Sequence, residues 1–335
     1  MEAFGEFEGE PVRRVSISDG LLTASVIEWG AVVQDLRLAG HGAPLVLGFE
    51  RFDPYPAQSP YFGAIAGRVA NRIRHARAPL DGRTVHVDAN VGGVHHLHGG
   101  SKGLGKRVWS IVDHATDRVT LEIASPDGEM GYPGRLVARC TYRVEGGALH
   151  VELSAETDAP TWVNLAHHSY FNLSDGGRTP VLDHTLRIDA ERYLKVDESF
   201  IAGGDPVSVE GTEHDWRAGT VIGSRATGSG DLPIWDHNYC LAGGTRPLTP
   251  VARVEGRSGV AMDVSTTEPG LQFYAGHKIA TGTPGLDGIR YRARSGLCLE
   301  AQRWPDAPNN PSYPSAVLRP GETYRQHTAY AFSIT

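Results

Sequence analysis

The chain has 335 residues, of which 40% are hydrophobic and 21% charged, and its formal net charge is −7. This composition predicts a folded protein with a sizeable core. The acidic balance, without a basic run that would neutralise phosphates, excludes nucleic acid and anionic membranes as expected partners. The absence of an apolar stretch of about 18 residues excludes a transmembrane helix.

The start of the chain is acidic and lacks the apolar segment of an export signal. The cysteines Cys140, Cys240 and Cys298 are widely spaced and form no C-x-x-C pair. Neither a disulfide framework nor a thiolate zinc site is therefore predicted. A reducing compartment fits this pattern best, so we expect a cytoplasmic protein.

Runs of alternating apolar and polar residues, bounded by Gly, Asp or Pro, recur from end to end and predict β-strands. No stretch has the apolar spacing of an amphipathic helix of three turns, which argues against alternating β-α units. Strands this numerous need two stacked sheets or a barrel. The expected strands span residues 13–18, 22–29, 31–38, 83–88, 118–123, 135–144, 148–156, 184–190, 297–302 and 328–334.

Glycine and proline are spread along the chain instead of gathering in one linker, and no repeat of fixed period is present. We therefore expect residues 1–335 to form a single all-β domain. The loop-like segment 203–238 is expected to cover one end of it, because long ordered loops are often functional.

The stretch NLAHHSYFNL, residues 164–173, places two histidines side by side. In a regular strand, alternate side chains point to opposite faces. The odd positions, including His167, are mostly apolar, so we expect His167 to pack inward and His168 to face a polar cleft. Two alternatives stay open: both histidines are structural, or a β-bulge reverses the assignment. The even face consists of Trp162, Asn164, Ala166, His168, Tyr170 and Asn172.

A second polar face is predicted in SGLCLEAQRWPDAPNN, residues 295–310, where Glu300 and Gln302 project together from an otherwise apolar strand. A glutamate in this position is not expected to be a solvated surface charge. Burial would raise its pKa and neighbouring donors would lower it, so the direction of the shift stays open.

Three weaker candidates complete the set. His98 precedes a Gly-Gly turn in VHHLHGG, where a ligand can approach the backbone closely. Asn71 and Arg72 in GRVANRI offer amide and guanidinium donors that suit hydroxyl-rich ligands. Asp236 in WDHNYCL offers an acceptor for two vicinal hydroxyls. A turn or cap role is at least as compatible with Asp236, and a structural salt bridge with Arg72.

Two patterns are set aside. GSKGLGKR, residues 100–107, matches G-x-x-x-x-G-K, but Arg107 stands where a P-loop needs Ser or Thr, and no β-α unit surrounds it. His96, His98, His168 and Asp236 are ligand types that a metal on a β scaffold would use, but no second signature sets their spacing. We expect no metal and no nucleotide.

Taken together and in this order, the segments resemble the aldose 1-epimerase (galactose mutarotase) family. The resemblance covers nearly the whole chain, from LVLGFERFDPY through EPGLQFYAG to LRPGETY. It implies a large antiparallel β-supersandwich and a cofactor-free interconversion of the α and β anomers of a free monosaccharide such as galactose or glucose. It also implies His168 as general acid and Glu300 as general base. We count His98 with the catalytic residues, and the substrate-binding set is Asn71, Arg72, His98, Tyr170, Asp236 and Gln272.

In this mechanism the base takes the proton of the C1 hydroxyl while the acid protonates the ring oxygen. We expect a nearby carboxylate to raise the pKa of His168 towards neutrality. The chain departs from the family at His95, His167 and His277, where asparagine is usual. All three are expected next to the cleft, which leaves the preferred aldose open. A phosphorylated hexose is disfavoured because no cluster of Arg or Lys is present in these segments.

Two other functions remain to be weighed at this point. One is a β-sandwich glycoside hydrolase that uses Glu300 and Asp236 as its carboxylate pair. The other is a sugar-binding module without turnover, since a fold and a pocket do not guarantee catalysis. The oligomeric state is left open.

Overall fold

The protein is described here by a computed structural model that covers residues 1–226 and 232–334. Each of the ten expected strands coincides with an observed strand over at least part of its length. The named strand pairs are antiparallel, as in β12 against β13 and β23 against β24. The fold is therefore nearly all-β, as predicted.

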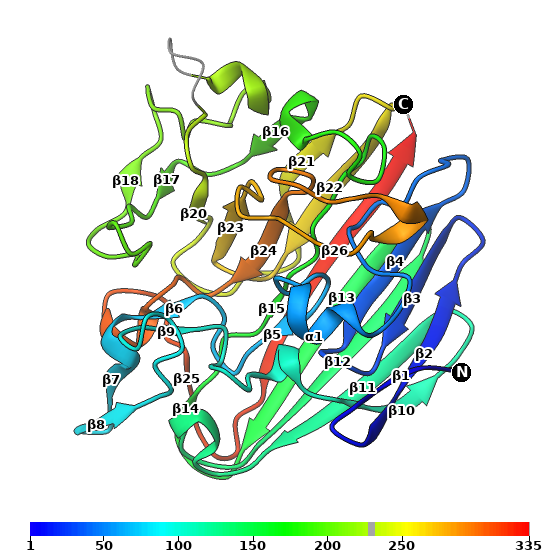
Figure 1. Ribbon diagram of the computed structural model, residues 1–335. Helices are drawn as coiled ribbons and strands as arrows, with labels where there is room; N and C mark the ends of the chain where they lie inside the picture. The colour runs from blue at the N-terminus through cyan, green and yellow to red at the C-terminus, as the bar shows by residue number, and fades with distance from the viewer. Residues whose placement is uncertain (227–231, 335) are drawn as a thin grey trace.

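The largest sheet has nine strands in the order β10-β11-β12-β13-β26-β22-β21-β16-β19 (Figure 1). Its strands are β10 (Ser110–His114), β11 (Arg118–Ser125), β12 (Leu136–Glu145), β13 (Ala148–Thr157), β16 (Thr185–Ile188), β19 (Thr220–Val221), β21 (Thr249–Glu255), β22 (Val260–Thr266) and β26 (Tyr324–Ile334).

Two smaller sheets accompany it, a four-stranded one in the order β1-β2-β3-β4 and a five-stranded one in the order β18-β17-β20-β23-β24. The first comprises β1 (Glu2–Phe7), β2 (Glu10–Ser18), β3 (Leu22–Ile27) and β4 (Val32–Leu38). The second comprises β17 (Arg192–Tyr193), β18 (Val207–Ser208), β20 (Asp236–Cys240), β23 (Gly270–Tyr274) and β24 (Cys298–Gln302).

Short pairs and turns connect these sheets. The pairs are β5 (Ile65–Ala66) with β15 (Ala166–His167), β6 (Arg72–Ile73) with β9 (His96–Leu97), β7 (Arg77–Leu80) with β8 (Arg83–His86), and β14 (Thr161–Trp162) with β25 (Val317–Leu318). The helices are α1 (Pro54–Gln58) and the 3₁₀ turns η1 (Arg74–Ala76), η2 (Leu104–Lys106), η3 (Glu129–Gly131), η4 (Val181–Asp183), η5 (Ile222–Arg225), η6 (Leu286–Gly288) and η7 (Ala307–Asn309). No helix in the described part of the chain is long and apolar enough to cross a membrane.

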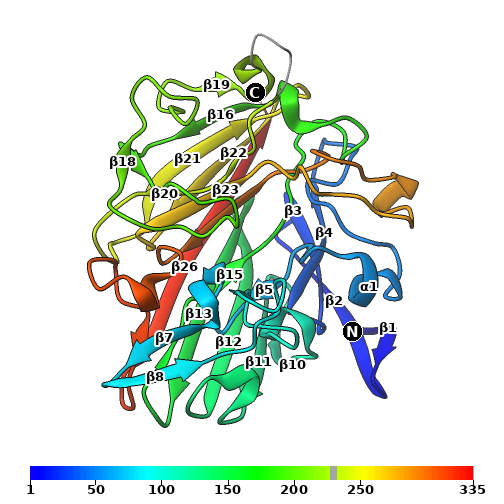
Figure 2. The ribbon, with the colours of Figure 1, turned by 60° about the vertical axis from the view of Figure 1, so that its left-hand side comes forward.

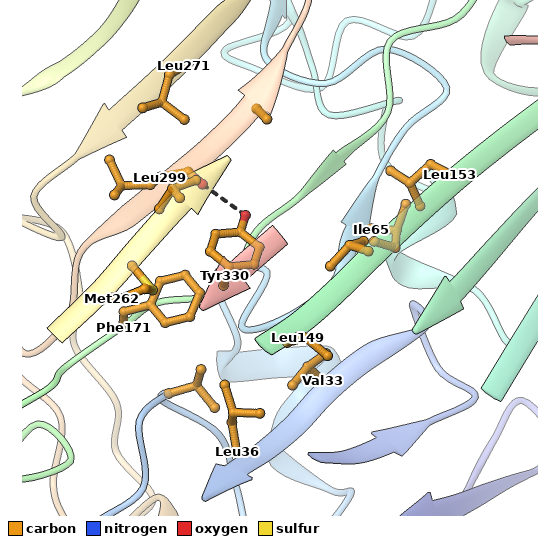
Figure 3. Packing of buried hydrophobic residues seen from close by; sticks show 14 of the residues in the cluster. Val33, Leu36, Ile65, Leu149, Leu153, Phe171, Met262, Leu271, Leu299 and Tyr330 are labelled. Carbon is orange, nitrogen blue, oxygen red and sulfur yellow. Dashed lines mark hydrogen bonds between the residues drawn. The ribbon is translucent and has the colours of Figure 1, made fainter. Parts of the chain in front are cut away.

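The two smaller sheets pack on one face of the nine-stranded sheet. The Tyr142 hydroxyl of β12 donates a hydrogen bond to the carbonyl oxygen of Ala31 beside β4 (2.7 Å), and Tyr330 of β26 donates to that of Leu299 in β24 (3.0 Å). Figure 3 shows Leu271 and Leu299 on one side of Tyr330, and Val33 and Leu36 near Leu149 of β13. In Figure 2, β20 and β23 lie near β21 and β22, at the end of the nine-stranded sheet that is far from β1.

Some strands were not expected. β20 and β23 carry few exposed side chains, so the exposed-buried alternation that marks a surface strand is weak there. Segment 203–238 was expected to be an irregular cover, but it contributes β18, β19 and the start of β20 to the edges and interior of two sheets. Residues 227–231 of this segment lie outside the described residues.

Candidate active site

Three neighbouring strands, β20, β23 and β24, build one polar wall. Their register pairs Asn238 with Gln272 and Gln272 with Glu300, so a row of polar side chains crosses the sheet. Leu271 and Leu299, one position away, belong to the hydrophobic core. Strand alternation thus turns Glu300 away from the core, as the sequence pattern predicts, and its side chain is almost fully buried.

A chain of hydrogen bonds fixes the carboxylate of Asp236 on this wall. Gln302 Nε2 donates to Gln272 Oε1 (3.3 Å), and Gln272 Nε2 donates to Asp236 Oδ1 (2.7 Å). Arg72 Nη1 lies 3.8 Å from Asp236 Oδ2. An amide and a cation therefore orient Asp236, and Gln272 acts on the site through it.

The stretch 164–173 is less regular than a full strand, because only Ala166 and His167 form β15. His167 nevertheless points inward as expected. Its Nε2 lies 2.9 Å from Ser169 Oγ, and its ring lies edge-on to those of Tyr142 and Tyr330. His167 is thus a core residue, and the expectation that it lies next to the cleft is wrong.

His168 points to the other side, towards β24. Its Nε2 lies 3.6 Å from Glu300 Oε2, and its Nδ1 lies 3.5 Å from Cys298 Sγ. Glu300 Oε2 is buried and accepts no hydrogen bond from any described residue. The imidazole and the carboxyl therefore face each other with one carboxyl oxygen available for a further donor.

Asn71 and His98 hold each other beside the imidazole of His168, whose ring centroid lies 5.1 Å from that of His98. Both have left-handed backbone conformations, with φ of 61° and 50°, which non-glycine residues rarely adopt and which are typical of functional sites. The Asn71 N–H donates to His98 Nδ1 (3.2 Å), and the His98 N–H donates to the Asn71 carbonyl (3.0 Å). Because Nδ1 accepts a hydrogen bond, neutral His98 carries its proton on Nε2 and is a donor.

These side chains meet around a cavity of about 210 Å³. Of the predicted site residues, Gln272 alone is not part of its lining, because it lies behind Asp236. The lining residues are Pro60, Tyr61, Asn71, Arg72, Leu97, His98, His168, Tyr170, Asp236, Tyr274, Lys278 and Glu300.

Burial shifts the pKa values of His168 and Glu300, the two groups that face each other in the cavity. It lowers the pKa of His168 to about 4, outweighing the opposite effect of the Asp236 carboxylate. The expected upward shift of this pKa is therefore wrong. Burial, and then the Asp236 charge, raise the pKa of Glu300 well above its usual range, while Arg72 opposes them. Burial therefore favours the neutral form of both groups, a neutral imidazole at His168 and a protonated carboxyl at Glu300.

His98, His168 and Glu300 each offer a metal-ligand atom, and these atoms lie within 4.8 Å of one another. A metal-bound histidine coordinates through one nitrogen and donates its other N–H to a neighbour. In His98, the Asn71 N–H occupies Nδ1, so the nitrogen that remains carries the proton. The hydrogen bonding does not fit a metal site, and we keep the prediction of metal-free chemistry.

The predicted polar row of residues 162–172 reaches the cavity at two positions, His168 and Tyr170. Tyr170 lines it with its ring, since its hydroxyl donates to the Pro60 carbonyl (2.9 Å). The expectation of one continuous polar row is wrong for the rest. Trp162 packs in a separate hydrophobic cluster, and Asn164 accepts a hydrogen bond from a backbone N–H outside the cavity.

Of the two remaining unusual histidines, neither lines the cavity itself. His95 accepts a hydrogen bond at Nδ1 from the N–H of His75 (3.1 Å). His277 is half-buried, with its ring centroid 5.1 Å from that of Tyr274, a lining residue. His277 is therefore one side chain away from the cavity.

Five lining residues were not predicted: Pro60, Tyr61, Leu97, Tyr274 and Lys278. Alternation from Gln272 would have found Tyr274, because the two residues share a face of β23. Tyr61 and Lys278 lie in loops, where no periodic signal exists.

Comparison with known proteins identifies the family of the chain. Residues 13–331 match the family described as aldose 1-epimerase. The chain is 39% identical to human galactose mutarotase over 337 residues, covering 99% of this chain and 97% of the relative. It is 35% identical to aldose 1-epimerase of Escherichia coli K12, covering 97% and 96%.

Solved structures give the same result. The crystal structure of a GalM/aldose epimerase homologue from C. elegans superposes with a TM-score of 0.90 at 30% identity and covers 97% of this chain and 99% of that one. That of galactose 1-epimerase from Lactobacillus acidophilus NCFM gives 0.85 at 25% identity, covering 99% and 97%. The chain belongs to the aldose 1-epimerase family, and it is an isomerase with the mutarotase fold.

Proposed function

We propose that this enzyme interconverts the α and β anomers of free aldoses, with galactose and glucose as substrates, by general acid-base catalysis at His168 and Glu300. The observation that carries the proposal is the contact of 3.6 Å between His168 Nε2 and Glu300 Oε2 in a cavity lined by hydroxyl-binding groups. Both relatives quoted above are named for this type of reaction.

The reaction needs two proton transfers. Glu300, as the carboxylate, takes the proton of the C1 hydroxyl, while His168, as the imidazolium, gives a proton to the ring oxygen. The C1–O5 bond breaks and an aldehyde forms. After rotation about C1–C2 the transfers reverse, and the hydroxyl re-adds to the other face of the aldehyde.

The protonation of the pair suits this cycle. Ring opening turns imidazolium and carboxylate into neutral imidazole and protonated carboxyl, which is the arrangement that burial favours in this structure. Both arrangements hold one proton in total. The pair therefore needs no proton from solvent during turnover.

The other lining groups are assigned to the sugar hydroxyls. Asp236, fixed by Arg72 and Gln272, accepts hydrogen bonds from hydroxyls, and Asn71 and His98 supply donors. The carboxyl of Glu300 faces an imidazole, and this partner favours anomer exchange over hydrolysis by a Glu300–Asp236 carboxylate pair.

We also propose that residues 1–335 form one domain, because the main hydrophobic cluster joins residues from Val15 to Phe332. The three free cysteines support the proposal of a cytoplasmic enzyme. The acid-base pair described above requires no cofactor for its chemistry.

Polarimetry tests the function directly. The optical rotation of freshly dissolved α-D-galactose and α-D-glucose is followed with the wild-type protein, with Glu300→Gln and in buffer, because spontaneous mutarotation sets a background. We expect acceleration by the wild type and loss of that acceleration in the variant, which keeps the size of the side chain. Acceleration by both proteins would contradict the role of Glu300, and acceleration by neither would contradict the proposed substrates.

A further inference from the structure

We propose that Tyr61 is a positioning residue of this enzyme: its ring, supported by the glycine-rich turn at residues 103–107, holds the imidazole of His168 in the orientation that proton transfer requires. The inference rests on the proposed role of His168 as general acid.

Tyr61 contacts both imidazoles of the cavity. Its ring is stacked on His168, with centroids 5.8 Å apart and planes at 19°, and it is tilted against His98 at 4.7 Å. Tyr170 provides a second stacked ring on His168, at 5.1 Å and 24°. Two near-parallel aromatic rings therefore restrict rotation of the imidazole about its side-chain bonds.

The backbone holds Tyr61 in one uncommon conformation. Its φ is 67°, in the left-handed region, which is strained for a non-glycine residue. The turn around it is closed by hydrogen bonds from the Ala64 N–H to the Tyr61 carbonyl (3.1 Å) and from the Phe62 N–H to Ser59 Oγ (2.8 Å). The ring is thus presented from a fixed turn.

The segment GSKGLGKR supports this ring from behind. Lys106 Nζ lies 5.2 Å from the centroid of Tyr61, a cation-π contact. A Cβ added at Gly105 would lie 3.2 Å from Tyr61 Cδ1, and one added at Gly103 would lie 2.4 Å from the His98 carbonyl oxygen. Gly103 and Gly105 therefore allow this turn to pack directly against His98 and Tyr61 in the cavity wall.

The expected effect of losing the ring follows from two consequences. First, the imidazole gains freedom to rotate, and a displacement of about 1 Å costs up to roughly 100-fold in rate. Second, water reaches His168, so its pKa rises from about 4 towards the ordinary value. The charged and titratable groups that face His168 are Glu300, Cys298, His98, Asp236, Tyr61 and Tyr170, with Lys106 behind Tyr61.

Tyr61→Leu and Tyr61→Phe separate positioning from folding. For Tyr61→Leu we expect kcat on galactose to fall by about 10- to 100-fold with a small change in KM, and the acidic limb of the pH profile to move to higher pH. Tyr61→Phe keeps the ring, so its kcat should be close to that of the wild type. The acidic limb of its pH profile should lie where it does in the wild type. If Tyr61→Leu fails to fold, Tyr61→Met carries the same comparison.

Tyr313→Leu is the matched control. The Tyr313 ring packs on that of Trp304, with centroids 5.1 Å apart, and it does not line the cavity. This variant should lower the unfolding midpoint without moving the pH profile. A folded Tyr61→Leu with wild-type kcat and pH profile would overturn the inference, and so would a Tyr61→Phe that is as impaired as Tyr61→Leu. If Glu300→Gln and His168→Asn are also fully active, the proposed function itself fails, and the two failures are thereby distinguished.

Discussion

The two sides of the segment around β15 differ sharply in chemistry although both are buried. His167 packs among tyrosine rings of the core, while His168 faces Glu300 across the cavity. Burial lowers the pKa of His167 to about 3 and that of His168 to about 4. A perturbed pKa therefore does not distinguish the catalytic side from the structural one, whereas the facing partner does.

The same comparison holds for two buried glutamates. Glu268 is fully buried beside β23, and burial raises its pKa to about 7, with Arg303 Nε 3.4 Å away. Glu268 does not line the cavity, whereas Glu300 does. A carboxyl that faces a fixed cation is held in place, but one that faces a neutral imidazole has a partner with which to exchange a proton.

The largest expected effect is a loss of kcat, and it separates His168 from His167. His168→Asn removes the general acid and should lower kcat on galactose by about 10²–10⁴-fold. His167→Asn, tested beside it by polarimetry, should turn over at nearly the wild-type rate, because its side chain does not reach the cavity. Equal losses in the two variants would break the distinction between the two sides.

The next largest expected effect is a rise in KM, and it separates Asp236 in the cavity from Glu268 outside it. Asp236→Asn removes the charged acceptor for sugar hydroxyls and should raise KM by roughly 10- to 100-fold, since a hydrogen bond to a charged group contributes about 1.5–3 kcal/mol. Glu268→Gln is the matched control with a buried carboxylate away from the cavity and should leave KM unchanged. Steady-state kinetics on galactose measure both, and an unchanged KM in Asp236→Asn would show that Asp236 does not contact substrate.

The pH dependence sharpens the comparison further. The His168–Glu300 pair works when it holds one proton, so the plot of kcat/KM against pH should be bell-shaped. It should fall at low pH as His168 takes up a second proton near pH 4, and at high pH as the pair loses its last proton above the usual range of a glutamate. A stopped-flow polarimetric profile checks this. An acidic limb near pH 6.5 would show that His168 is not buried during catalysis.

The smallest expected effect is a change in the free energy of unfolding that depends on His167 and on pH. The pKa of His167 is lower in the folded chain than in the unfolded chain, so the unfolded state binds more protons as pH falls below about 6.5. The wild type should therefore lose stability from that pH down towards pH 3. His167→Asn should lower the free energy of unfolding by about 1–3 kcal/mol at pH 7, through loss of packing and of the Ser169 hydrogen bond.

Urea unfolding of both proteins at pH 7 and pH 4.5 measures this effect. The difference between them should narrow at the lower pH, because the variant no longer has to keep this imidazole neutral. A constant difference at both pH values would show that His167 does not contribute to the acid sensitivity.

Alternation in the sequence was sufficient to predict much of the site. It placed Glu300 opposite the core-facing Leu299, and it separated His168 from His167, although β15 is only two residues long. Alternation depends on the pleat of the local backbone, so it is readable without knowledge of the partners. The motifs added the family, and with it the expected chemistry and the supersandwich fold.

Tertiary structure decided what alternation does not encode. Tyr61, Lys278 and the Asn71–His98 pair reach the cavity from loops, whose positions depend on contacts between distant segments. The direction of the His168 pKa shift depends on how much water the surrounding walls exclude. Gly103 and Gly105 have a role only because His98 and Tyr61 pack against them. The sequence by itself determined which side chains are available and which face of a strand they share. Their distances, their burial and their proton affinities arise from the packing of three sheets, because these quantities depend on atoms that are far apart in the chain.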